Sequence, residues 1–113
     1  MKIINNQIKL TELKILAQNT FGDLVKAVVD IEKEIMAIDG ELHADEERLL
    51  LEHGCEQKNL WGINIYPEMS GKDLIEFDSM INIRPSQGNR TRGIDDIKIQ
   101  DKIFKITDKL IKK

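Results

Sequence analysis

The stretch Leu24-Val-Lys-Ala-Val-Val-Asp-Ile-Glu-Lys-Glu-Ile-Met-Ala-Ile38 decides the predicted fold, because it contains the pattern of two consecutive strands. Its first half, Leu24–Ile31, is rich in Val and Ile and alternates between apolar and polar residues at its end. Its second half, Glu34–Ile38, is again largely apolar. We therefore predict an antiparallel hairpin that turns near Glu32-Lys33, although this pair is not a strong turn signal.

Two later segments, Leu60–Tyr66 and Asp73–Arg84, predict a second hairpin. The segment Asp73–Arg84 is the longest alternating stretch of the chain, so we expect one face to cover the core and the other to meet solvent. The expected core face carries Ile75, Phe77, Ile81 and Ile83, and the expected polar face carries Glu76, Asp78, Asn82 and Arg84.

Three helices are expected around these strands. The first begins near Leu10 and ends before Gly22, and the second spans Ala44–His53. Asp95 or Asp96 can cap the third, whose isoleucines repeat at helical spacing. The order α-β-β-α-β-β-α predicts an α+β fold with an antiparallel sheet of about four strands, and 113 residues fit a single domain covering 1–113.

Composition narrows the classes of function. The chain is 41% hydrophobic and 33% charged, as in globular proteins. Only 4% of its residues are aromatic and its net charge is -3, which makes nucleic acid an unlikely partner. Its single cysteine, Cys55, excludes an intrachain disulfide and a cysteine zinc site. We expect no signal peptide and no membrane span, and therefore a cytoplasmic protein.

The loop Arg84–Gly93 is the candidate ligand-binding segment, since three of the four arginines of the chain fall in it. Arginine side chains are planar donor forks suited to carboxylate or phosphate, and neutral donors accompany them. The loop lacks the Gly-Lys-Ser/Thr ending of a phosphate-binding loop. An equally open alternative is that the arginines pair with carboxylates of the same protein. The predicted ligand-binding residues are Asn82, Arg84, Ser86, Gln87, Asn89, Arg90 and Arg92.

Three residues are candidates for catalysis: Glu76, Asp78 and His43. If the second hairpin forms, Asn64 would lie beside Glu76 and Gly62 beside Asp78, with room above that carboxylate. Two carboxylates at i, i+2 could share a cation or serve as acid and base. The polar face of any solvated sheet has the same pattern. The metal motif around His43 lacks a second histidine, so we predict no metal site and no cofactor.

The charges are distributed unevenly along the chain. Between Asp39 and Glu56 there are seven acidic residues against one base, whereas Lys98–Lys113 holds six lysines against two acids. Such asymmetry is compatible with solvated helix faces or with a homo-oligomer that pairs the two segments.

Three stretches also resemble a small prokaryotic family of uncharacterised function: Gly40-Glu-Leu-His-Ala-Asp-Glu-Glu47, Leu60-Trp-Gly-Ile-Asn-Ile-Tyr-Pro67 and Phe77-Asp-Ser-Met-Ile-Asn-Ile-Arg-Pro-Ser-Gln-Gly-Asn-Arg90. The resemblance covers nearly the whole chain and implies no activity or cofactor. From the residues we favour a binding module for a small anionic ligand. The alternatives are a metal-assisted hydrolase that uses Glu76 and Asp78, and an interaction protein.

Overall fold

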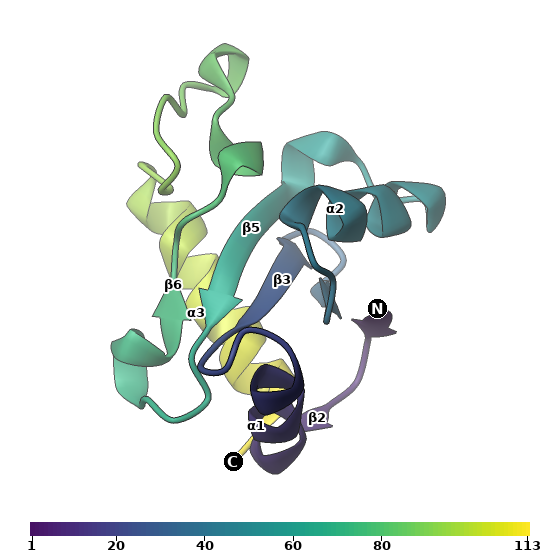
Figure 1. The fold of residues 1–113 in the computed structure, drawn as a ribbon. Coiled ribbons are helices and arrows are strands. Elements are labelled where there is room, and N and C mark those ends of the chain that lie inside the picture. Colours follow the sequence, from purple (N-terminus) through teal and green to yellow (C-terminus); the bar gives the residue numbers. More distant parts are fainter.

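Five strands form one antiparallel sheet in the order β1-β4-β3-β5-β6 in the computed structural model, which describes residues 1–113 (Figure 1). These strands are β1 (Lys2–Ile4), β3 (Val25–Asp30), β4 (Ile35–Ile38), β5 (Leu60–Ile65) and β6 (Ile75–Glu76). Two further strands, β2 (Ile8–Lys9) and β7 (Ile111–Lys112), form a separate parallel pair. The helices are α1 (Leu10–Asn19), α2 (His43–Glu52) and α3 (Ile97–Leu110). The α+β class is confirmed, with more strands than expected.

The central hairpin β3–β4 forms where it was predicted, with Val29 opposite Met36. Its turn depends on Asp30, which is buried and whose Oδ1 accepts hydrogen bonds from the amides of Glu32 and Lys33 at 2.8 and 2.9 Å. A carboxylate that bonds amides two and three residues later can set a turn without a favourable turn pair. The side chain of Asp30 therefore explains why Glu32-Lys33 can occupy the turn.

Helices cover both faces of the sheet, and each face has its own core. On one face, α1 and α3 contribute to a core of 19 buried residues that includes Leu13, Ile103 and Leu110. On the other face, α2 packs Leu50 into a core of six buried residues. Figure 1 shows α2 and α3 on opposite sides of β3 and β5. The predicted helical periodicity of α3 is confirmed, and Asp96 caps it by accepting the Lys98 amide at 2.9 Å.

The predicted strand Asp73–Arg84 is wrong, because only Ile75–Glu76 pairs with β5. The 3-10 helices η2 (Gly71–Leu74) and η3 (Met80–Asn82) occupy half of the remainder, and a third, η4 (Pro85–Gln87), follows directly after Arg84. Beyond β6 the side chain of Asn82 takes the place of a strand. Its Oδ1 accepts the Gly62 amide at 2.8 Å, and its Nδ2 donates to the Gly62 carbonyl at 2.9 Å. At Gly62 the edge of β5 is thus satisfied by one side-chain amide.

The expected faces of this segment change accordingly. Asn82 and Arg84, expected in solvent, are buried, whereas Ile83, expected in the core, is 38% exposed. The space above Gly62 is also filled: a Cβ there would lie 2.5 Å from the Cβ of Ser79. Gly62 therefore permits a close approach of Ser79, so the open space expected at Gly62 is absent, and Gly62 does not pair with Asp78 as expected. The predicted register of Asn64 opposite Glu76 is confirmed.

Candidate functional site

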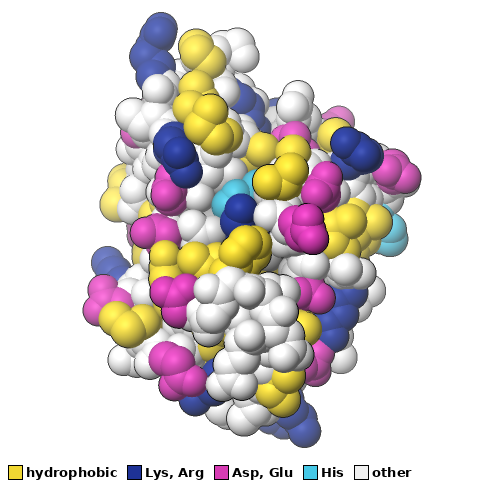
Figure 2. Space-filling model, in the orientation of Figure 1, with side chains coloured by type: hydrophobic (Ala, Val, Ile, Leu, Met, Phe, Trp, Pro, Cys, Tyr) yellow, Lys and Arg dark blue, Asp and Glu magenta, His cyan; other side chains and the backbone are white.

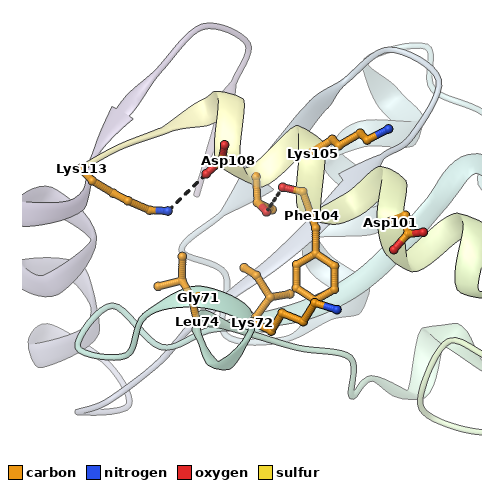
Figure 3. A pocket seen from close by; sticks show the side chains of 10 residues that line it. Gly71, Lys72, Leu74, Asp101, Phe104, Lys105, Asp108 and Lys113 are labelled. Carbon is orange, nitrogen blue, oxygen red and sulfur yellow. Dashed lines mark hydrogen bonds and ion pairs between the residues drawn. The ribbon is translucent and has the colours of Figure 1, made fainter.

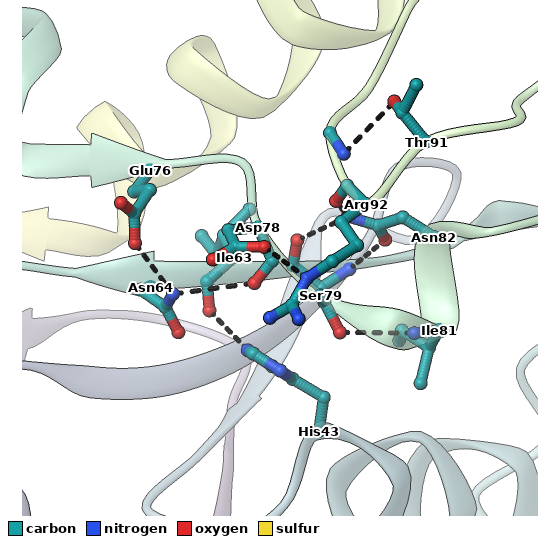
Figure 4. Close-up of polar contacts among 12 residues, drawn as sticks. His43, Ile63, Asn64, Glu76, Asp78, Ser79, Ile81, Asn82, Thr91 and Arg92 are labelled. Atoms are coloured by element: carbon teal, nitrogen blue, oxygen red, sulfur yellow. Dashed lines mark hydrogen bonds and ion pairs between the residues drawn. The ribbon is translucent and has the colours of Figure 1, made fainter.

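Polar side chains from four segments meet on the α2 face of the sheet, next to β6 (Figure 4). We call this group the polar cluster, and it consists of His43, Asn64, Glu76, Asp78 and Arg92. His43 is the first residue of α2, Asn64 lies on β5, Glu76 ends β6, and Arg92 precedes α3. In Figure 2 a histidine lies near the centre of the visible face, with acidic and basic side chains around it and hydrophobic ones between them.

Glu76 is held through one of its two carboxylate oxygens. Its Oε1 accepts hydrogen bonds from Asn64 Nδ2 at 2.8 Å and from the Tyr66 hydroxyl at 2.9 Å. Burial, together with the hydrogen bond to Glu76, raises the pKa of Tyr66 to about 12, so the hydroxyl remains a donor at neutral pH. The Oε2 atom of Glu76 has no hydrogen-bond partner in the protein.

Arg92 is fixed at its backbone and at one guanidinium nitrogen. Its carbonyl accepts hydrogen bonds from the Ser79 amide at 2.9 Å and from Asn82 Nδ2 at 3.0 Å. Its Nε donates to Asp78 Oδ1 at 2.6 Å. The two terminal nitrogens form no hydrogen bond with the protein, the side chain is 57% exposed, and the guanidinium end points toward His43 in Figure 4. Asp78 therefore orients a guanidinium whose outer edge remains available.

His43 has a defined protonation state and ring orientation. Its Nε2 lies 2.8 Å from the Ile63 carbonyl, which can only accept, so Nε2 carries the hydrogen. Burial lowers the pKa of His43, and the positive charge of Lys26 lowers it further, although the bond to Ile63 opposes both effects. The ring is thus neutral at pH 7, and Nδ1 is an unprotonated acceptor.

Arg84, a predicted ligand-binding residue, is instead embedded in the loop. Its Nε donates to the Ile81 carbonyl at 3.0 Å, its Nη1 to the Gln57 carbonyl at 2.7 Å, and its Nη2 to the Leu60 carbonyl. The guanidinium also lies 4.6 Å from the ring centre of Trp61. The alternative that the arginines pair with carboxylates of the protein holds for Arg92, which pairs with Asp78, and not for Arg84. Arg84 instead ties the loop to the start of β5.

The other predicted loop residues divide into an inner and an outer group. Asn89 is buried, and its Nδ2 donates to the carbonyls of Asn82, Thr91 and Gly93 at 2.6, 3.1 and 2.8 Å. With Asn82 and Arg84 it builds the inside of the loop. The exposed outer group forms no hydrogen bond with the polar cluster, and it consists of Ser86, Gln87 and Arg90.

The structure thus brings together the three catalytic candidates and one predicted arginine. No group of three or more His, Cys, Asp or Glu side chains lies close enough to hold a metal ion. The cluster offers an oriented guanidinium, a neutral imidazole and two carboxylates that each keep one unpaired oxygen. The sequence analysis did not identify Tyr66 as part of the site. Because Tyr66 lies two residues after Asn64, the alternation of side chains along a strand places both on the same face.

Comparison with known proteins gives a family but no activity. A family model described as "Protein of unknown function (DUF5674)" matches residues 2–110. No curated protein and no solved structure matches the chain. None of the helices has the length and apolar composition needed to span a membrane. The resemblance to an uncharacterised family is confirmed, and the chain belongs to the DUF5674 family.

Proposed function

We propose that this protein is a small binding domain for a ligand with a carboxylate or phosphate group, and that Arg92 contacts that group. One observation carries the proposal: the guanidinium is held at Nε by Asp78 while its terminal nitrogens remain exposed and unpaired. A fork that is already oriented loses less conformational entropy when it binds an anion in a bidentate manner.

The neighbours of Arg92 support a ligand larger than a bare anion. His43 Nδ1 and Glu76 Oε2 are acceptors, so they favour a ligand that carries a hydroxyl or amino group near its anionic group. A pocket of about 370 Å³ adjoins Glu76 and Tyr66. Its volume is within the range of small-molecule sites, which run from roughly 300 to 1,000 Å³. The remainder of the ligand can occupy this pocket.

The predicted arginine loop takes a narrower role in this proposal. Asn82, Arg84 and Asn89 support the backbone of the loop, since their polar groups bond to protein carbonyls and amides. Ser86, Gln87 and Arg90, also predicted as ligand-binding residues, form no hydrogen bond with the polar cluster, and the proposal gives them no contact with the anionic group.

The experiment is a titration of ¹⁵N-labelled protein with inorganic phosphate and with acetate at constant ionic strength. We expect saturable amide shifts at the polar cluster in the wild type. Arg92→Gln should weaken binding by about tenfold, because one charge-assisted contact is worth roughly 1.4 kcal/mol or more. Arg90→Gln removes the same charge two residues away and should leave the affinity nearly unchanged. Equal affinities of all three proteins, or no saturable shift in the wild type, would contradict the proposal.

A second candidate, acid–base hydrolysis, is favoured by the neutral ring of His43. An imidazole fixed at Nε2 by a carbonyl presents Nδ1 as a general base, the role that histidine most often has in catalysis. The test is hydrolysis of a chromogenic phosphate or carboxylate ester. A rate that rises with pH as His43 loses its proton, and that is lost in His43→Gln, would support this function, and equal rates in both proteins would reject it.

We also propose a cytoplasmic location in a prokaryotic cell. The single cysteine, Cys55, is a buried free thiol, which suits a reducing compartment. The prokaryotic origin is proposed because three stretches of the sequence resemble a small prokaryotic family.

A further inference from the structure

A second hollow lies on the opposite side of β6, between η2 and α3, and has a volume of about 450 Å³ (Figure 3). Its floor is apolar. Leu74 and Ile75 are 4% and 6% exposed, and the partly buried Phe104 contributes its ring. Phe104 is braced by Phe77, with the ring centroids 5.2 Å apart and the planes at 73°. The floor is therefore held by core packing and does not depend on a ligand for its shape.

The rim of this hollow carries more positive than negative charge. Its charged residues are Lys72, Asp101, Lys105, Asp108 and Lys113. Lys113 pairs with Asp108 at 3.2 Å, as drawn in Figure 3. Lys72 and Lys105 form no ion pair, and the Lys72 ammonium lies 5.7 Å from the ring centre of Phe104. With three lysines and two aspartates, the rim has a net charge of +1 and two cations without a carboxylate partner.

We propose that this hollow is a second binding site, and that it takes an amphipathic monoanion such as an aryl or alkyl carboxylate or sulfonate. The hydrocarbon part covers Leu74, Ile75 and Phe104, and the acid group lies beside Lys72, whose ammonium is near the Phe104 ring, while Lys105 adds positive charge to the rim. An inorganic anion would leave the apolar floor in water, and a neutral hydrocarbon would leave both lysines without a counter-charge. The proposal does not depend on Arg92, because none of these residues belongs to the polar cluster. Lys72 and Ile75 also line the pocket of about 370 Å³ beside Glu76, whereas Leu74, Phe104 and Lys105 line the second hollow and not that pocket.

The proposal is tested with 8-anilinonaphthalene-1-sulfonate, a fluorescent aryl sulfonate, added to the folded protein. We expect saturable binding that hexanoate displaces and inorganic phosphate does not. Lys105→Glu should raise the dissociation constant about tenfold, because it replaces the attraction for the sulfonate with repulsion. Lys98→Glu is the matched control, since it makes the same charge change at an exposed position two turns earlier on α3 that does not line the hollow. It should change the constant by less than about twofold.

Three results would overturn the proposal. One is an equal loss of affinity in both variants, which would show a general charge effect. Another is equally tight binding of the uncharged analogue N-phenyl-1-naphthylamine, which would show that the lysines do not select the ligand. The third is fluorescence that appears only when urea begins to unfold the protein, as reported by Trp61 emission.

Discussion

Replacing Glu46 by Gln should make the stability of the protein less dependent on pH. Glu46 lies in the first turn of α2 and is fully buried. Its Oε2 accepts the Gly40 amide at 2.9 Å, whereas its Oε1 has no hydrogen-bond partner. Burial raises the pKa of Glu46 from 4.5 to about 9, despite the opposing bond from Gly40. At neutral pH the carboxyl is therefore protonated in the folded protein and ionised in the unfolded chain.

The size of the effect follows from this difference in proton binding. Between the two pKa values, each pH unit lowers the free energy of unfolding by about 1.4 kcal/mol, because only the unfolded chain releases the proton. The contribution of the protonated carboxyl is thus complete below pH 4.5 and is lost as the pH rises toward about 9. By pH 7 the loss amounts to roughly 3 kcal/mol. Glu46→Gln keeps the shape and the acceptor for Gly40, so it removes this slope. Its unpaired amide hydrogens impose a cost of about 1–3 kcal/mol that does not vary with pH.

The assay is urea unfolding followed by the fluorescence of Trp61, the only tryptophan, at pH 5, 6, 7 and 8. Glu52→Gln, an exposed change at the end of the same helix, is the control and should keep the slope of the wild type. The stability of Glu46→Gln relative to the wild type should increase steadily over this range. A difference that stays constant with pH would refute the reasoning, because it would mean that Glu46 titrates near its ordinary pKa in the folded protein.

Three further predictions concern the loop and the smaller core. Arg84→Lys should lower the free energy of unfolding by about 2–4 kcal/mol, because a lysine cannot serve three separate carbonyls, while Arg90→Lys should be neutral in the same urea assay. Gly62→Ala should destabilise the protein through the contact with Ser79, and Ser79→Gly in the same chain should restore most of the loss; no rescue would mean that the strain arises elsewhere. Burial raises the pKa of Cys55 to about 11, so a thiol reagent at pH 8 should react with it only as fast as the protein unfolds, and rapid labelling of the native protein would contradict its burial.

The helices and the central strands could be predicted because their patterns are local. The isoleucines of α3 repeat with the period of a helix. The short apolar run before Asp30 is rich in valine, which is typical of a buried strand. The turn after β3 was a weaker inference, since the residue that sets it is the last one of the strand and not the turn pair.

The segment Asp73–Arg84 could not be predicted, since its alternation of apolar and polar residues also fits a chain that turns away from the sheet. Where the pairing has ended, the side-chain amide of Asn82 bonds both backbone groups of Gly62 in place of a neighbouring strand. Such a contact joins residues that are distant in sequence and leaves no local signal.

The candidate site could be predicted only in part, because some of its contacts follow from strand pairing and others join residues that are distant in sequence. The register of Asn64 and Glu76 follows from strand pairing, so the polar face of β5 and β6 was accessible to sequence reasoning. The sequence did not indicate which arginine would be buried. Arg84 is buried because it donates to the backbone carbonyls of Gln57 and Leu60, which lie near it only in the folded chain.

The most direct test of Arg92 as the anion contact is the Nε–H resonance of its side chain during a phosphate titration at constant ionic strength. This hydrogen is bonded to Asp78 in the free protein, so anion binding at the terminal nitrogens should shift the resonance with the same saturation curve as the amides of the polar cluster. The Arg90 resonance should move little and linearly. Equal, unsaturable shifts of both arginines, or no shift of Arg92, would contradict the assignment.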